Sequence, residues 1–219
     1  MPPPSCITIP AVVKHTATVI VAHGLGDSGA GWVSLAENWR RREKFQENFG
    51  MTMPGWYDIS SFSDLQAEQD EPGIRRSQAY FHSLIKSEIE DSNIPSNRIV
   101  IGGFSQGGAM SIFSGITCPS KLGGIFGLSC YLLLHNKLRE YAEKGFNKQT
   151  KIWMGHGDCD PLVKPEWGRK TAEILREEGY DVELSMYPGL EHSADLSEID
   201  DLEKYLNNRI PPIGDKESL

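Results

Sequence analysis

The stretch from Arg98 to Met110 constrains the fold more than any other part of the sequence. It begins with the β-branched, apolar run Ile99-Val-Ile101, which is typical of a buried parallel strand. The next five residues, Gly103-Phe-Ser-Gln-Gly107, fit G-x-S-x-G with Ser105 at the centre. Apolar positions spaced as on a helix follow from Ala109 onward. A strand, a tight turn carrying a serine and a helix together predict a nucleophile elbow.

One alternative is that Ser105 only caps the helix after a glycine-rich turn. The strand before the turn and the helix after it favour the elbow. Glycines suit such a turn because its strained backbone leaves almost no room for side chains.

The whole chain alternates strand patterns with helix patterns, which predicts an α/β fold with a mostly parallel, doubly wound sheet. We expect an edge strand within residues 5–15 and further strands at 16–22, 99–101, 123–129, 151–155 and 182–187. We expect helices after residue 29, over 74–90, after Ser105, and over 138–144, 167–178 and 196–210. Residues 43–73 contain no β-branched apolar run, so no strand is predicted there.

Composition narrows the class of protein. The chain has 219 residues and a net charge of −8, so we expect one domain, residues 1–219, without a nucleic-acid surface. Its longest apolar stretch, 124–134, is about half the ~20 residues that a membrane-spanning helix needs. The start at Met1 lacks the features of a signal peptide, so we expect a cytoplasmic protein. The four cysteines show no C-x-x-C spacing, which indicates neither a zinc site nor a disulfide framework.

The loop after the strand at 16–22 allows two interpretations. Residues Gly24-Leu-Gly-Asp-Ser-Gly29 fit G-x-G-x-x-G, a fingerprint of dinucleotide-binding proteins. The acid that should follow on a second strand would be Glu43 or Glu47, but the charged run around them is typical of a helix end. The alternative is an oxyanion loop, in which the backbone N–H of Leu25 acts together with that of Gln106. We favour the oxyanion loop.

A serine nucleophile needs a histidine base, and the base needs a carboxylate. In elbow-containing α/β proteins these follow in the order serine, acid, histidine. His192 is the one histidine downstream of the acidic loop after the strand at 151–155. In that loop Asp160, which precedes a proline, is favoured over Asp158, for which a structural role is expected. His156 is the strongest rival base, and His23 is expected to brace the oxyanion loop.

Seven stretches make the chain resemble the acyl-protein thioesterases, the carboxylesterase and lysophospholipase-like branch of the α/β-hydrolases. They are His23-Gly-Leu-Gly-Asp27, Gly31-Trp32, Met53-Pro-Gly-Trp-Tyr-Asp58, Ile94-Pro-Ser-Asn-Arg98, Gly102-Gly-Phe-Ser-Gln-Gly-Gly108, His156-Gly-Asp-Cys-Asp-Pro-Leu-Val163 and Gly189-Leu-Glu-His192. The resemblance implies the α/β-hydrolase fold. It places the catalytic residues at Ser105, Asp160 and His192, and the oxyanion donors at Leu25 and Gln106.

The resemblance also implies the reaction. Members of this family hydrolyse thioesters between long acyl chains and protein cysteines, with weaker action on lysophospholipids and simple esters. No cofactor and no metal are implied. An apolar acyl groove is expected along 56–62 and 131–134, with Trp56, Tyr131 and Leu133 as lining residues. S-acylated proteins are the expected partners, with transient membrane contact at most, and the nucleus is a second expected location beside the cytoplasm.

The chain departs from the family pattern after the first helix, where the family has a strand and a Phe-Pro-x-Ala-Pro-like loop. Here 45–48 passes almost directly to 49–53, so one family strand is expected to be missing. That absence motivates an alternative, a non-catalytic binding protein with this fold. In a smaller departure, Leu133 stands where a proline is common in the family.

Overall fold

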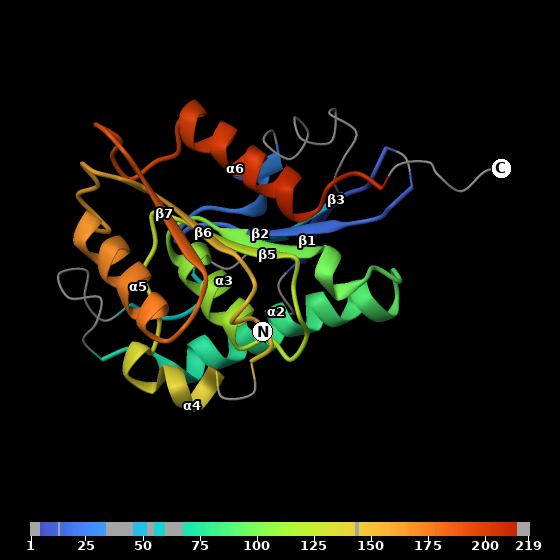
Figure 1. Ribbon diagram of the computed structural model, residues 1–219, viewed down its shortest axis with the longest axis horizontal. Coiled ribbons are helices and arrows are strands. Elements are labelled where there is room, and N and C mark those ends of the chain that lie inside the picture. Colours follow the sequence, from blue (N-terminus) through green and yellow to red (C-terminus); the bar gives the residue numbers. More distant parts are fainter. Residues whose placement is uncertain are drawn as a thin grey trace.

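The computed structural model describes residues 5–12, 14–33, 46–51, 55–59, 68–142 and 145–213 (Figure 1), with 46–51 as backbone alone. In these parts the chain alternates strands and helices. The strands are β1 (Ser5–Ile9), β2 (Thr18–Ala22), β3 (Gln46–Met51), β4 (Ile99–Gly103), β5 (Gly124–Leu128), β6 (Ile152–Gly157) and β7 (Val182–Tyr187). The helices are α2 (Glu71–Glu90), α3 (Gln106–Ile116), α4 (Leu138–Ala142), α5 (Pro165–Glu177) and α6 (Leu196–Arg209), and residues 29–33 are also helical.

The described strands form one seven-stranded sheet in the order β1-β3-β2-β4-β5-β6-β7. All neighbouring pairs are parallel except β1 and β3, which are antiparallel. The helix α6 covers one face, whereas α2, α3 and α5 cover the other (Figure 1). The predicted doubly wound α/β architecture is therefore confirmed.

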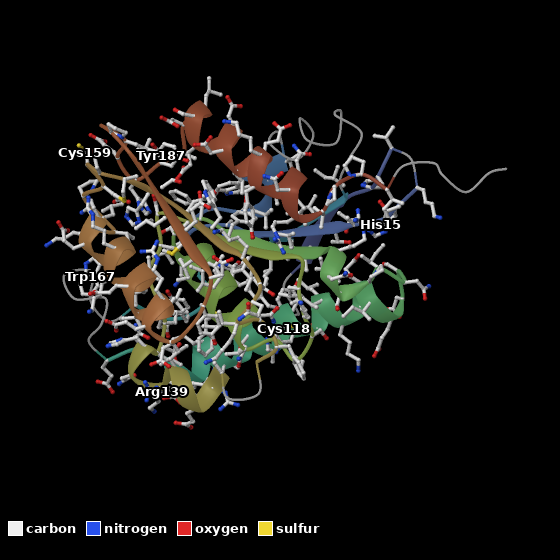
Figure 2. All side chains as sticks on the ribbon, viewed as in Figure 1. His15, Cys118, Arg139, Cys159, Trp167 and Tyr187 are labelled. Atoms are coloured by element: carbon white, nitrogen blue, oxygen red, sulfur yellow. The ribbon has the colours of Figure 1, made fainter. Side chains whose placement is uncertain are left out.

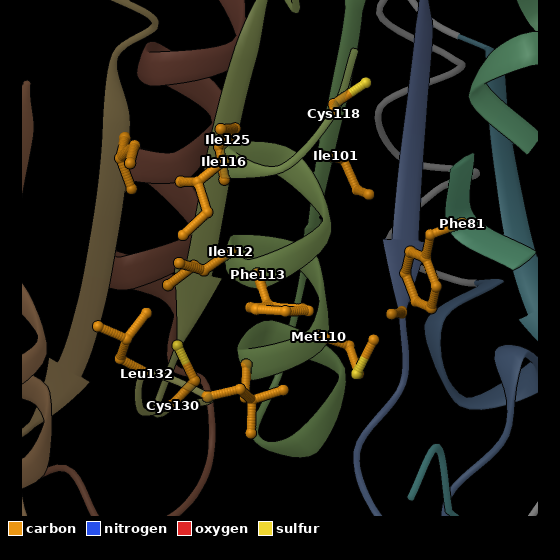
Figure 3. Close-up of a cluster of buried hydrophobic side chains, with 14 of the residues drawn as sticks. Phe81, Ile101, Met110, Ile112, Phe113, Ile116, Cys118, Ile125, Cys130 and Leu132 are labelled. Atoms are coloured by element: carbon orange, nitrogen blue, oxygen red, sulfur yellow. The ribbon is translucent and has the colours of Figure 1, made fainter. Parts of the chain in front are cut away.

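The strand residues alternate between two cores, as the two-residue period of a strand requires. Ile20, Ile101 and Ile125 pack into the core on the α2–α3–α5 face. Figure 3 shows this core around α3, where Ile112 packs against β5 and Phe113 contacts Tyr141 of α4. The neighbouring positions Val19, Val100 and Phe126 instead pack into the core beneath α6. Both faces of the central strands are buried, which explains their continuous apolar sequence.

The strand β3 overturns one expectation. No strand was predicted between residues 43 and 73, and one family strand was expected to be missing; β3 occupies that stretch. It pairs in parallel with β2, with Ile20 opposite Asn48, and antiparallel with β1, with Ile7 opposite Phe49. A segment with weak strand preference extends here because ladders on both sides satisfy its backbone N–H and C=O groups.

Local sequence sets the helix ends. Asp70 caps α2 by accepting from the N–H of Gly73, and Asp195 caps α6 by accepting from the N–H of Glu198. Gly179, with φ of 84°, follows the end of α5 and adopts the left-handed conformation that commonly ends a helix. Among the described residues, none of the helices combines the length and apolar character that crossing a membrane requires.

Candidate active site

Ser105 lies at the tip of the sharp turn between β4 and α3. Its backbone adopts φ 53° and ψ −120°, a strained conformation for a residue with a side chain. The turn is held because Phe104 donates its N–H to the carbonyl of Ala22 and Ser105 donates to that of Leu128. Gly107 makes this packing possible, since a Cβ there would collide with the backbone of β2. The predicted elbow is therefore present.

Three side chains meet at this turn, each from a loop after a different strand. His192 Nε2 lies 2.9 Å from Ser105 Oγ, and His192 Nδ1 lies 2.7 Å from Asp160 Oδ2. Figure 2 shows the end at which these loops lie: Cys159, beside Asp160, and Tyr187, at the end of β7, are far from His15. The carboxyl ends of parallel strands share one edge of a sheet, so these distant loops converge.

Charge fixes the proton positions in this relay. Burial raises the pKa of Asp160, but hydrogen bonds from His192 and from the N–H groups of Leu162 and Val163 outweigh it, so the pKa lies below its usual value. The ionised carboxylate accepts the Nδ1–H of His192. Nε2 then carries a lone pair toward the hydroxyl of Ser105, as a general base requires.

The rival residues lie elsewhere. Asp158 accepts from the N–H of Gly189 at 2.7 Å, which ties the Asp160 loop to the His192 loop. His156 is fully buried near the end of β6, where Nε2 donates to the carbonyl of Val163 and burial lowers its pKa. Its role is to hold the Asp160 loop from beneath.

Gly157 brings the same two loops close together. A Cβ at this last residue of β6 would collide with the carbonyl oxygen of Leu190. The backbone of the His192 loop therefore rests directly on the end of β6.

Two backbone N–H groups border the serine. Leu25 and Gln106 line the same cavity as Ser105, and neither donates its N–H to any other described residue. The N–H of Gln106 belongs to the first turn of α3, where the helix dipole favours negative charge. The two N–H groups are thus available to an oxyanion formed near Ser105 Oγ.

His23 holds the peptide that carries the N–H of Leu25. The carbonyl oxygen of that peptide belongs to Gly24, which accepts from His23 Nδ1 at 2.8 Å and from the N–H of Asp27 at 3.2 Å. In a planar trans peptide the C=O and N–H point in opposite directions, so fixing one fixes the other. His23 therefore orients the oxyanion loop, as the sequence indicated. The location of this loop beside Ser105 favours the oxyanion interpretation over dinucleotide binding.

The side chain of Gln106 clamps the 55–59 segment to the site. Its Oε1 accepts from the N–H of Trp56 at 2.8 Å, and its Nε2 donates to the carbonyl of Tyr57 at 2.7 Å. Ser77 adds a hydrogen bond to the carbonyl of Trp56. Gln106 is almost fully buried, so both of its bonds lie in a low-dielectric environment.

A cavity of ≈ 200 Å³ opens at Ser105. Its lining includes Tyr131 and Ile59, which lie in the predicted groove ranges, and three apolar residues that the sequence analysis missed, namely Phe104, Leu162 and Val163. Phe104 and His192 are in ring contact, with centroids 4.8 Å apart. A sequence signal existed for Leu162 and Val163, because apolar residues directly after Asp160-Pro161 are unusual in an exposed loop.

Two predicted groove residues do not line this cavity. The indole N–H of Trp56 donates to the carbonyl of His23 at 2.9 Å, which turns the ring into the core against Phe81. Leu133 is fully buried because the run 130–134 folds back into the core on the α3 face. Residues 60–62 of the expected groove lie outside the described residues.

The site combines an elbow serine that is hydrogen-bonded through a histidine to a carboxylate with two free N–H groups at an apolar cavity. This combination defines a serine hydrolase of the α/β-hydrolase fold. The model of the Phospholipase/Carboxylesterase family matches residues 5–210, and the chain belongs to this family.

Similar proteins and solved structures agree with this family assignment. The chain is 51% identical to acyl-protein thioesterase 1 of Neurospora crassa, with 96% of this chain and 94% of that protein covered. It is 53% identical to acyl-protein thioesterase 1 of Emericella nidulans, with 93% and 94% covered. The crystal structure of Arabidopsis thaliana SOBER1 is similar at a TM-score of 0.80 and 26% identity, with 89% of this chain and 99% of that chain covered.

Proposed function

We propose that this protein hydrolyses long-chain acyl thioesters on protein cysteines, with side activity on lysophospholipids and simple esters. The observation that carries the proposal is the relay from Asp160 through His192 to Ser105 at the mouth of an apolar cavity. The 48–53% identity to three fungal acyl-protein thioesterases over most of the chain supports the thioester substrate.

In the first half of the proposed reaction, His192 Nε2 takes the proton of Ser105 as Oγ attacks the thioester carbonyl carbon. The carbonyl electrons move onto oxygen, which the N–H groups of Leu25 and Gln106 stabilise by roughly 3–4 kcal/mol each. When the intermediate collapses, the C–S bond breaks and His192 returns the proton to the departing thiolate. The acyl group is then esterified to Ser105.

In the second half, water takes the place of the thiol. His192 removes one proton from the water as it attacks the acyl-enzyme carbonyl, and the same two N–H groups hold the second oxyanion. Collapse breaks the ester bond and the proton returns to Ser105 Oγ, which frees the fatty acid. The ionised Asp160 stabilises the imidazolium in both halves.

Fluorophosphonate labelling and thioester hydrolysis test this proposal together. We expect the wild-type protein to be labelled and to release a long-chain acyl group from a cysteine-acylated peptide, and Ser105→Ala to do neither. Labelling without thioester hydrolysis would leave a serine esterase with another substrate. A folded protein that reacts with neither reagent would support the non-catalytic alternative instead.

We also propose the cytoplasm as the site of action, with the nucleus as a second location. All four cysteines are free thiols, as is usual for proteins of these reducing compartments, and this supports the proposal. Fluorescence microscopy of the tagged full chain tests it, and a purely secreted protein would contradict it.

A further inference from the structure

The wall of the cavity contains a pair of tyrosine hydroxyls in contact. The hydroxyl oxygens of Tyr57 and Tyr131 lie 2.5 Å apart, and both side chains are buried. Tyr131 borders the cavity that contains Ser105, whereas Tyr57 lies behind it. Burial raises the pKa of Tyr131 to about 12, and burial together with the neighbouring Tyr131 also raises the pKa of Tyr57. Both hydroxyls therefore keep their protons near neutral pH.

The two hydroxyls have one O–H donor more than the hydrogen bond between them uses. Each tyrosine hydroxyl carries a single O–H donor, and only one of the two protons can lie between the two oxygens. Among the described residues, neither hydroxyl has another hydrogen-bond partner. Tyr57 has no access to the cavity, so its proton points to Tyr131. The proton of Tyr131 then points into the cavity.

Tyr131 lines the same cavity as Gln106, the residue that follows the nucleophile. Tyr57 is bound through its carbonyl to the side chain of Gln106. The leaving group must depart beside the base, His192, which stands on a different loop. The Tyr57–Tyr131 pair belongs instead to the wall that the Gln106 side chain holds in place.

We propose that Tyr131 determines specificity by donating a hydrogen bond to an oxygen in the acyl chain of the substrate. The proposal rests on the proposed function, since it assumes that this cavity receives the acyl group. A plain alkyl chain offers no acceptor and leaves the Tyr131 O–H unpaired in an apolar cavity. The cavity then prefers an acyl chain with an ether, keto or hydroxyl oxygen at one position over a plain chain of equal length.

The test measures kcat/KM for p-nitrophenyl esters of one chain length, either plain or with an ether oxygen at successive positions. We expect the wild-type protein to favour one oxygen position over the plain chain by about 3–10-fold. Tyr131→Phe abolishes this preference because it removes the donor that faces the cavity. Tyr57→Phe is the matched control: it breaks the same hydroxyl–hydroxyl bond, yet the Tyr131 donor and the preference remain.

Three outcomes overturn the inference. One is a wild-type protein that hydrolyses the plain and oxygenated esters equally at every position, a result that does not depend on any variant folding. The second is an equal loss of preference in both variants, which indicates a packing role. The third is a wild-type protein that hydrolyses no ester and is not labelled at Ser105, which defeats the proposed function as well.

Discussion

At the scale of single residues, the relay depends on one of two aspartates that lie two positions apart in the loop after β6. Asp160 contacts the imidazole of His192, whereas Asp158 contacts the backbone N–H of Gly189 and the thiol of Cys159. We expect Asp160→Asn to lower kcat on the order of 10⁴-fold, because an amide no longer holds the histidine in the tautomer that a base requires. Asp158→Asn keeps an oxygen acceptor for Gly189 and should stay near wild-type activity. Steady-state kinetics with one ester checks both, and comparable losses would contradict the assignment of the acid.

His23 offers a second test at this scale. His23→Phe keeps a ring against Trp56, 5.0 Å away between centroids, but loses the N–H that holds the Gly24 carbonyl. We expect kcat to fall at least ~10-fold, short of the 10²–10³-fold that removing an oxyanion donor costs. KM should change little, because the oxyanion exists only in the transition state and the intermediate. A raised KM with unchanged kcat would refute the orienting role, and a thermal melt confirms folding.

The sequence identified the groups with a chemical pattern and missed those that depend on packing. Ser105 was predictable from its glycines, and Asp160 and His192 from their order after strand ends. Leu133 was placed wrongly because an apolar residue can face a groove or the core with the same pattern. The clamp formed by the Gln106 side chain has no sequence signature, since its partners are backbone atoms of a segment about 50 positions away.

At the scale of elements, β3 is the largest difference between expectation and structure. Its residues lack the β-branched side chains by which strands such as β4 are recognised. The strand exists through its neighbours, because β1 and β2 supply hydrogen-bonding partners on both sides. The neighbouring strands therefore determine that residues 46–51 form a strand, and the sequence of this segment alone does not predict it.

Hydrogen exchange tests this strand directly. Within β3, amides that donate to the two ladders should exchange much more slowly than those of an exposed loop, and β1 should be protected on its β3 side. Deuterium uptake of peptides covering 46–51, compared with peptides covering the surface turn at 119–121, provides the measurement. Rapid exchange throughout 46–51 with slow exchange in β4 would show that the strand does not form.

At the scale of the whole molecule, one buried carboxyl couples stability to pH. Glu198 in α6 is fully buried, and neither of its oxygens has a hydrogen-bond partner among the described residues. Burial, with a smaller contribution from Asp195, raises its pKa from 4.5 to about 8. The folded protein therefore retains a proton that the unfolded chain releases above pH 4.5. The contribution of Glu198 to the free energy of unfolding should therefore fall as the pH rises from 4.5 to about 8. The loss is on the order of a few kcal/mol.

Glu198→Gln imitates the protonated carboxyl and should flatten this decline, which makes the variant more stable than the wild type at pH 8. Urea unfolding at several pH values across that range measures the effect. Asp200→Asn, an exposed change in the same helix, serves as the control and should preserve the wild-type slope. Parallel pH profiles for the wild type and Glu198→Gln would show that Glu198 ionises freely in the folded protein.

The contact between Gly157 and Leu190 sets the height of the imidazole above the nucleophile. A methyl group on residue 157 would displace the His192 loop away from β6, while the elbow and the sheet stay in place. The catalytic rate would then decrease although the protein still folds. Gly157 thus maintains the distance between His192 and Ser105 without contacting a substrate.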